Sequence, residues 1–161
     1  MTEFGAHSEV GKLRKVMVHR PDLSLQRLTP TNHDELLFDD VLWVERAQFE
    51  HDRFVEKMRE RGVEVYLFQN LLAEALAASE EAQKRLIEVA VTEYTVGLSL
   101  VDEVRSTLGN MKPDALAKHL IGGLTVAEAG VDLGKLKGSS LPAAALGDDT
   151  SAFILPPLPN T

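Results

Sequence analysis

Asp39 and Asp40 are adjacent carboxylates that stand between a loop and a segment with periodic apolar residues. Paired carboxylates can act as general acids and bases, and they can also bind metal ions. The same residues suit the start of a helix, where free backbone N–H groups and the helix dipole favour negative charge. We interpret Asp39 and Asp40 as helix-start residues, with a catalytic or metal-binding role as the alternative.

The spacing of the five histidines does not predict a metal site. A zinc site on a helix needs a second ligand four residues along, as in HxxxH, and His51 has none. We therefore predict that His51 is a core histidine on the apolar face of a helix. His19 stands at the end of a strand, and we expect it to have a structural role. The others are His7, His33 and His119.

No residue has the sequence context of a catalytic nucleophile. The chain has no cysteine, which excludes a thiol nucleophile, a disulfide and cysteine-bound zinc within it. No serine stands in GxSxG, and neither GxGxxG nor GxxxxGK[ST] occurs. The residues alone therefore indicate an α/β protein with a helical insertion, and they do not indicate a reaction.

Composition narrows the class of protein further. The chain has 161 residues, of which 44% are hydrophobic and 26% charged, as in an ordinary globular protein. The formal net charge of −8 argues against binding to nucleic acid or to an anionic membrane. The first residues lack the apolar stretch of a secretory signal, and no apolar run is long enough to span a bilayer. We expect a cytoplasmic protein.

Residues 1–70 have the pattern of a β–α–β portion. The run Lys15–His19 predicts a buried strand. Apolar residues at steps of three and four predict an amphipathic helix from Leu42 to Glu60, which ends at Gly62. Val63–Phe68 then predicts a second strand, parallel to the first because a helix connects them.

Residues 71–150 carry helix-capping signals at short intervals, which predict a small helical subdomain inserted into the α/β pattern, followed by a Gly-, Ser- and Ala-rich loop from about residue 130. Residues 151–161 predict a returning strand, Ser151–Leu155, and a turn at Leu158-Pro159-Asn160. The expected starts and stops of the helices are Asn70, Ser79, Ser99 with Gly109, Pro113 with Gly122 and Gly123, and the capping box Thr125–Glu128.

Six segments follow one another in a characteristic order and spacing. They are HSEVGKLRKVMVHRP (His7–Pro21), RLTPTN (Arg27–Asn32), ELLFDD (Glu35–Asp40), VERAQFEHDRFVEKMRERGVEV (Val44–Val65), HLIGG (His119–Gly123) and LPPLPNT (Leu155–Thr161). Taken together, these segments resemble arginine deiminases, and the resemblance covers essentially the whole chain.

The resemblance implies a pentein-like five-bladed α/β propeller with a helical subdomain inserted in its first part. It implies hydrolysis of L-arginine to L-citrulline and ammonia, with no metal or organic cofactor, by an enzyme that we expect to be a homo-oligomer when complete. In such a reaction carboxylates grip the guanidinium, a thiolate attacks its carbon to give a covalent adduct, and a histidine transfers protons. In the family these groups follow the LPN turn. We therefore expect this chain to be the N-terminal portion of such an enzyme, without its catalytic residues and inactive alone.

Two substrate-binding residues are implied within the chain. Leu37 resembles the leucine whose backbone carbonyl meets the α-amino end of arginine, and Asn160 resembles the asparagine that contacts its carboxylate end. The alternatives are that Leu37 covers the core and that Asn160 makes an Asx-turn. Two other functions stay open: a non-catalytic module that binds a protein partner through its helical subdomain, and a related guanidino-modifying enzyme such as a dimethylarginine hydrolase or an amidinotransferase.

Overall fold

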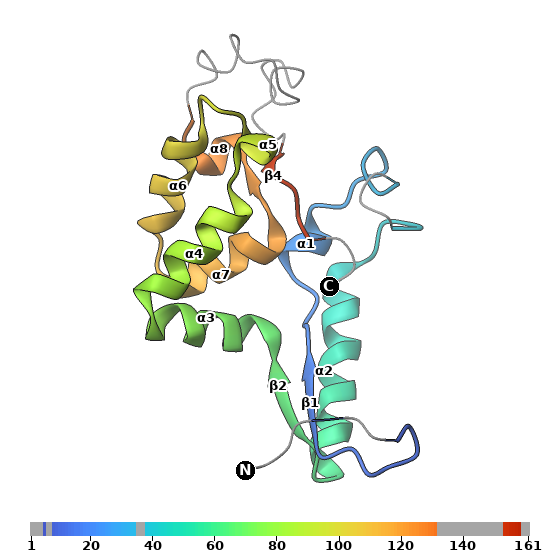
Figure 1. Cartoon of the computed structure of the whole chain (residues 1–161). Helices are drawn as coiled ribbons and strands as arrows, with labels where there is room; N and C mark the ends of the chain where they lie inside the picture. Colours follow the sequence, from blue (N-terminus) through green and yellow to red (C-terminus); the bar gives the residue numbers. More distant parts are fainter. Residues whose placement is uncertain (1–4, 6–7, 35–37, 132–152, 159–161) are drawn as a thin grey trace.

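A computed structural model describes residues 5, 8–34, 38–131 and 153–158, and it shows a mixed α/β chain, as the sequence predicted (Figure 1). The five-bladed propeller and the division into residues 1–70, 71–150 and 151–161 stay predictions. The strands are β1 (Lys15–Val18), β2 (Glu64–Leu67), β3 (Leu124–Thr125) and β4 (Phe153–Leu155). The helices are α1 (Leu23–Gln26), α2 (Val44–Glu60), α3 (Phe68–Ala78), α4 (Glu80–Ala90), α5 (Glu93–Val96), α6 (Val101–Gly109), α7 (Pro113–Gly122) and α8 (Val126–Ala129).

β1 and β2 form the predicted parallel pair, in which Lys15 is the register partner of Glu64 and Val18 that of Leu67. Val16 is partly buried, whereas Met17 is 58% exposed. Successive side chains of a strand point to opposite faces, so the described residues cover only one face of β1. The strand predicted at Lys15–His19 is therefore confirmed as β1, but the prediction that it is buried is wrong.

α2 has the predicted amphipathic character, but it begins at Val44 and not at Leu42. Its N-cap position is Trp43, and residues 41–43 are not helical. The interpretation of Asp39 and Asp40 as helix-start residues is therefore wrong; Asp40 Oδ1 instead accepts the N–H of its neighbour Val41 at 2.7 Å.

The end of α2 is as predicted. Gly62 has φ of 77°, and its N–H donates to Arg59 O at 2.9 Å, while the N–H of Val63 donates to Met58 O at 3.1 Å. This pair of bonds is a Schellman motif, which needs the left-handed backbone that glycine adopts easily. The turn aims the chain directly into β2.

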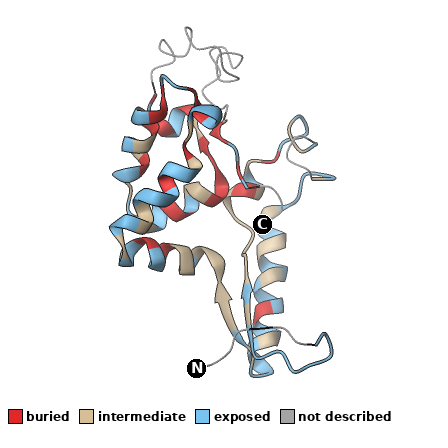
Figure 2. Cartoon of the chain, viewed as in Figure 1, coloured by how far each residue is buried: buried red, intermediate tan, exposed pale blue. Residues whose placement is uncertain are grey.

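The apolar core lies in the helical region, by which we mean α3–α8 with β3 and β4. Figure 2 shows that buried residues gather there, while β1, β2 and α2 are mostly half-buried or exposed. The core cluster runs from Ala73 to Leu155, and α2 contributes only Val55 to the buried residues. Its most enclosed members, each 0% exposed, are Val91, Val104, Leu108, Leu116 and Leu124.

Local capping signals predicted several helices of this region correctly. Ser79 ends α3 and caps α4, since its Oγ accepts the N–H of Ala82 at 3.1 Å. Pro113 opens α7, and Thr125 forms a capping box with Glu128 at the start of α8. Ser79 and the Thr125–Glu128 box satisfy backbone N–H groups that a helix start leaves free, whereas Pro113 has no N–H that needs a partner.

Other helix boundaries differ from the prediction. Asn70 lies inside α3, which begins at Phe68 directly after β2, so Asn70 is not a cap. α6 begins at Val101 with Leu100 at its N-cap position, so Ser99 is not a cap either. The sequence did not predict α5, and most of the loop expected after residue 130 lies outside the described residues.

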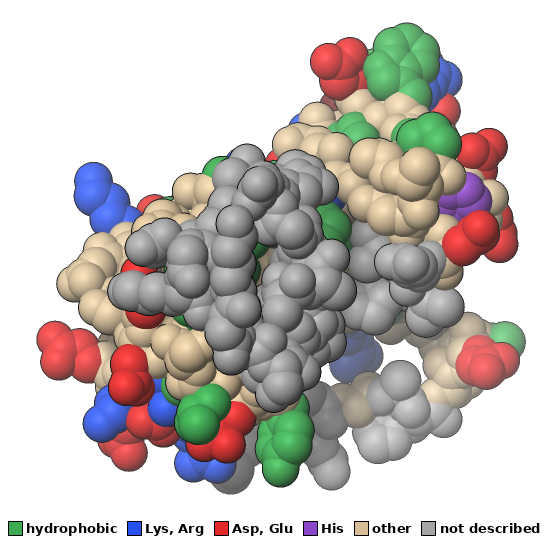
Figure 3. Space-filling view, turned by 90° about the horizontal axis from the view of Figure 1, so that it is seen from above, with side chains coloured by type: hydrophobic (Ala, Val, Ile, Leu, Met, Phe, Trp, Pro, Cys, Tyr) green, Lys and Arg blue, Asp and Glu red, His purple; other side chains and the backbone are tan. Residues whose placement is uncertain are grey.

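β3 pairs with β4 in antiparallel orientation, and Leu124 is the register partner of Leu155. β4 confirms the described part of the strand predicted at Ser151–Leu155. Seen from above, several of the basic side chains in view stand beside acidic ones (Figure 3). No helix in the described part of the chain is both long and apolar enough to cross a membrane.

Candidate functional site

Leu37 and Asn160, the two predicted substrate contacts, lie outside the described residues. Their described neighbours Phe38 and Leu158 line one small cavity of about 140 Å³. The fold therefore brings together two segments that are far apart in the sequence and that adjoin the two predicted contacts. The other lining residues are His19, Pro21, Ser24, Leu25 and Leu42.

α1 forms one wall of this cavity through Ser24 and Leu25, and Ser24 is only 6% exposed. α1 is seated against the last turn of α7 at Gly122. A Cβ at position 122 would lie 2.6 Å from Cβ of Leu23 and 2.7 Å from its Cγ. The wall can take this position because residue 122 has no side chain.

Leu158 forms another wall, and the end of α7 holds it. Its N–H donates to Ile121 O at 2.9 Å. The segment before it passes over Gly123, where a Cβ would lie 2.6 Å from Leu155 O and 2.7 Å from Pro157 N. Two adjacent glycines at the end of α7 therefore support two walls of the cavity. Gly122 supports the wall that α1 forms, and Gly123 supports the wall that Leu158 forms.

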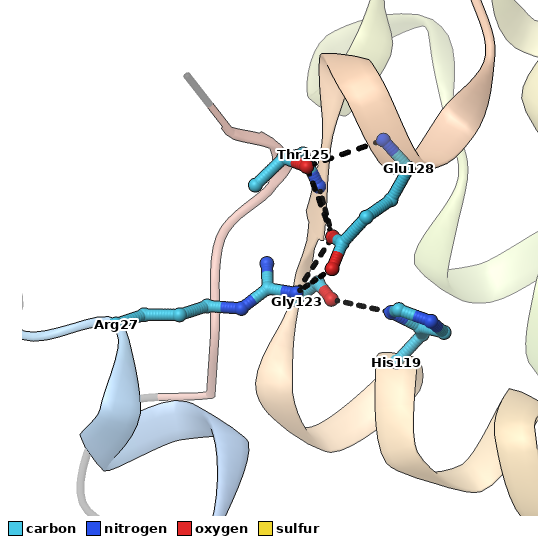
Figure 4. Close-up of polar contacts among 5 residues, drawn as sticks. All are labelled: Arg27, His119, Gly123, Thr125 and Glu128. Atoms are coloured by element: carbon cyan, nitrogen blue, oxygen red, sulfur yellow. Dashed lines mark hydrogen bonds and ion pairs between the residues drawn. The ribbon is translucent and has the colours of Figure 1, made fainter. Parts of the chain in front are cut away.

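His119 and Arg27 make further polar contacts near the end of α7, where Gly122 and Gly123 lie; we call this end of α7 the corner (Figure 4). His119 Nδ1 lies 3.1 Å from Gly123 O, and because a carbonyl only accepts, Nδ1 carries the hydrogen. Arg27 Nη2 donates to both carboxylate oxygens of Glu128, at 2.6 and 2.9 Å, and its guanidinium lies 5.5 Å from the ring centroid of Phe153. Arg27 thus joins the chain after α1 to α8 and to β4.

In the Arg27–Glu128 pair the side chain of Arg27 is largely enclosed, at 8% exposed, whereas that of Glu128 is 38% exposed. Burial raises the pKa of the Glu128 carboxyl. The backbone N–H and hydroxyl of Thr125 and the guanidinium of Arg27 outweigh this effect, so the pKa lies below its ordinary value. Glu128 is therefore both the capping-box residue of α8 and the ion-pair partner of Arg27.

Hydrogen bonds hold the described residues that follow Arg27, and they tie Phe38 to His33. Asn32 accepts the N–H of Thr29 at 2.7 Å and donates to Arg27 O at 2.9 Å. His33 Nδ1 donates to Phe38 O, and the N–H of Phe38 donates to His33 O, both at 2.9 Å. Through Asn32 and His33, these bonds connect Arg27 with Phe38, which lines the cavity.

Of the other candidate residues, His19 lines this cavity, whereas Asp39, Asp40 and His51 do not. Asp39 and Asp40 are exposed and do not line it. His51, with its side chain 13% exposed, is partly buried on α2 but does not belong to the core cluster, so the prediction of a core histidine is met only in part. His19 lines the cavity and packs edge-on against Phe68, with ring centroids 6.1 Å apart. In the described part of the chain no group of three or more His, Cys, Asp or Glu could hold a metal ion.

A family model described as "Arginine deiminase" matches residues 34–161. The chain belongs to the arginine deiminase family. It is 44% identical over 157 residues to an "Arginine deiminase" of Rhodococcus erythropolis (strain PR4 / NBRC 100887), and 42% identical over 160 residues to one of Mycobacterium avium (strain 104). A third, of Mycobacterium bovis (strain BCG / Pasteur 1173P2), is 44% identical over 158 residues.

These matches cover 98–99% of this chain but 38–39% of each relative. The chain therefore spans well under half the length of the arginine deiminases it matches. The sequence did not predict two features of the corner: the contact of Arg27 with Glu128, and the close packing at Gly122 and Gly123. The glycines were visible only as a helix stop, and nothing local to Arg27 indicates a partner 101 residues away.

Proposed function

We propose that the polypeptide carrying this sequence is an arginine deiminase, which hydrolyses L-arginine to L-citrulline and ammonia. The observation that carries the proposal is an identity of 42–44% over nearly the whole chain to proteins named arginine deiminase. The cavity beside Phe38 and Leu158 supports it, because the residues next to the two implied substrate contacts converge there.

In this proposal the 161-residue chain supplies part of the rim of the substrate site. The backbone carbonyl of Leu37 accepts from the α-amino group of arginine, and Asn160 donates to its carboxylate. The central carbon of a guanidinium is a poor electrophile, and the implied mechanism attacks it with a cysteine thiolate. Because the chain has no cysteine, we propose that it does not catalyse this reaction alone.

The proposal extends to the setting of the enzyme. We propose a cytoplasmic homo-oligomer that uses neither a metal nor an organic cofactor. In it this chain forms the first blade of a five-bladed propeller and its inserted helical subdomain. The close packing of Gly122 on α1 and of Gly123 on residues 155–157 supports a fixed relation between these parts.

The test begins with the polypeptide expressed from the native gene. Its intact mass is measured, and citrulline formed from L-arginine is assayed for that product and for residues 1–161 alone. We expect citrulline from the native product and none from residues 1–161. A native product that makes no citrulline overturns the proposed activity and favours the partner-binding module. Turnover by residues 1–161 overturns the claim that this chain is inactive.

The role of Asn160 is tested in the active native product. Loss of a hydrogen bond to a charged group corresponds to roughly a 10- to 100-fold rise in KM, with a smaller change in kcat, for Asn160→Ala. The matched control is Asn110→Ala, since Asn110 is exposed and donates only locally, to Ser106 O at 2.8 Å. An unchanged KM for Asn160→Ala would leave Asn160 as a turn residue.

A further inference from the structure

The end of α7 is the place where the two walls of the candidate cavity are fixed. Gly122 seats α1, which carries Ser24 and Leu25, and Gly123 lies beneath the segment that leads to Leu158. Because the two glycines are adjacent, the backbone at residues 122–123 sets the position of both walls of the cavity. We propose that Gly123, held by His119, is a positioning residue for substrate binding.

The backbone of Gly123 is the first support for this role. Its φ of 80° and ψ of 176° fall in a region that is essentially restricted to glycine. A side chain there would also meet backbone atoms, because a Cβ would lie 2.6 Å from Leu155 O, 2.7 Å from Pro157 N and 2.9 Å from the carbonyl carbon of Pro156. Because Pro156 and Pro157 make the backbone of this segment stiff, the segment could not adjust locally to a Cβ at position 123 and would be displaced as a whole.

Contacts on either side of Gly123 tie its geometry to the cavity. The hydrogen bond from Leu158 N–H to Ile121 O, at 2.9 Å, fixes the segment just after the crossing. The hydrogen bond from His119 Nδ1 to Gly123 O, at 3.1 Å, orients the peptide plane at the crossing (Figure 4). Leu158 then lines the cavity, and Asn160 follows two residues later in the sequence.

The inference rests on the proposed function, because it assigns to this corner the task of setting how arginine is bound. Gly123 is not among the residues that line the cavity, so its effect passes through residues 155–158. If a Cβ at position 123 displaces residues 155–158, binding of the substrate should weaken more than the chemical step slows.

The main variant is Gly123→Ala in the active native product, and the matched control is Gly130→Ala. Gly130 also has positive φ, of 65°, but a Cβ there would meet nothing within 4 Å. We expect Gly123→Ala to raise KM for arginine about tenfold with kcat within about twofold. The amide of Leu158 should also lose its protection from hydrogen exchange. Gly130→Ala should do neither.

A second pair of variants keeps the test decisive if Gly123→Ala does not fold. His119→Ala removes the donor to Gly123 O, whereas His119→Asn keeps an N–H donor at nearly the same position. We expect His119→Ala to raise KM about threefold and His119→Asn to restore it, both with the fold intact by circular dichroism.

The outcomes separate this inference from the proposed function. If the native product converts arginine to citrulline but Gly123→Ala and His119→Ala leave KM unchanged, the positioning role is overturned and the function stands. Retained protection of the Leu158 amide in Gly123→Ala also overturns it. A native product without arginine hydrolysis overturns the function, and the assignment of this corner to arginine falls with it.

Discussion

Leu116 in α7 is completely enclosed, whereas Met17 in β1 leaves 58% of its surface exposed. The two residues typify two regions of the chain. The helical region buries a continuous apolar cluster, and its helix starts at Ser79 and Thr125 are capped by side chains. The β1–α2–β2 unit has one buried apolar residue, Val55, in its long helix. Phe49 and Phe54 of α2, and Trp43 just before it, are more than half exposed.

In the β1–α2–β2 unit, polar contacts hold the elements together to a greater extent than in the helical region. Arg20 donates to both carboxylate oxygens of Asp52, at 2.8 and 2.9 Å, and this bonding lowers the pKa of Asp52. Gln48 of α2 donates to Pro21 O at 2.9 Å. Contacts of this exposed kind contribute little stability individually, while apolar burial contributes in proportion to area. The helical region should therefore supply most of the stability of this chain.

Truncation of apolar side chains tests this difference most strongly. Leu116→Ala should lower the free energy of unfolding by about 3 kcal/mol, because it leaves a cavity in an enclosed core. Met17→Ala should change it by less than about 0.5 kcal/mol, because much of the side chain already meets solvent. Urea unfolding of residues 1–161 measures both. Equal losses would show that the two regions form a single, evenly packed core.

The Arg27–Glu128 pair joins the segment between β1 and α2 to the helical region, and its removal should have the next largest effect. Arg27→Ala should lower the free energy of unfolding by about 1–2 kcal/mol, since it leaves a partly buried carboxylate without its cation; the exposure of Glu128 keeps the loss below that of a fully buried pair. Arg53→Ala removes an exposed pair with Glu56 on α2 and should cost less than about 0.5 kcal/mol. If Arg53→Ala costs as much as Arg27→Ala, burial does not distinguish the pairs.

Acid should weaken the same link by a smaller amount. The pKa of Glu128 is lower in the folded chain than in the unfolded one, so in acid the unfolded state binds more protons. Its contribution is present above about pH 4.3, the ordinary value for glutamate, and is lost as the pH falls through the lower folded-state pKa. Urea unfolding from about pH 6 to pH 3 should show a shallower decline for Glu128→Gln than for the wild type.

Glu74→Gln is the control for this pH series, because Glu74 is exposed on α3. Its decline should parallel that of the wild type. A Glu128→Gln series that also parallels the wild type would mean that the carboxylate of Glu128 contributes no pH-dependent stability, and the ion pair would then act only through packing.

The sequence predicted features whose cause is local. Ser79, Pro113 and the Thr125–Glu128 box act on backbone groups within three residues, so their meaning does not depend on the rest of the fold. Gly62 is similar, because the Schellman turn needs only a left-handed residue there.

Tertiary context decided the features that the sequence did not predict. α3 starts at Phe68, before the plausible cap Asn70, because the helix follows β2 directly. α5 is one turn long, and its cap pairs Thr92 with Thr95 where a capping box ordinarily has Glu or Gln. β3 has two residues, too few to show a strand pattern.

The candidate site was predictable only through family resemblance. Leu37 and Asn160 have no local signature of substrate binding, and they remain proposals. The cavity that adjoins them depends on a contact between α7 and segments at both ends of the chain. No pattern within a short window of sequence encodes such a contact.

The pairing of β3 with β4 has a consequence for protein engineering. Because Leu124 and Leu155 are register partners, the chain that passes from β3 through α8 returns at β4, directly beside β3. The entropy of closing such a loop grows slowly, by about 0.6 kcal/mol for each doubling of its length. An epitope tag or a small reporter peptide inserted between Val131 and Phe153 should therefore leave Leu155 and the crossing at Gly123 in place.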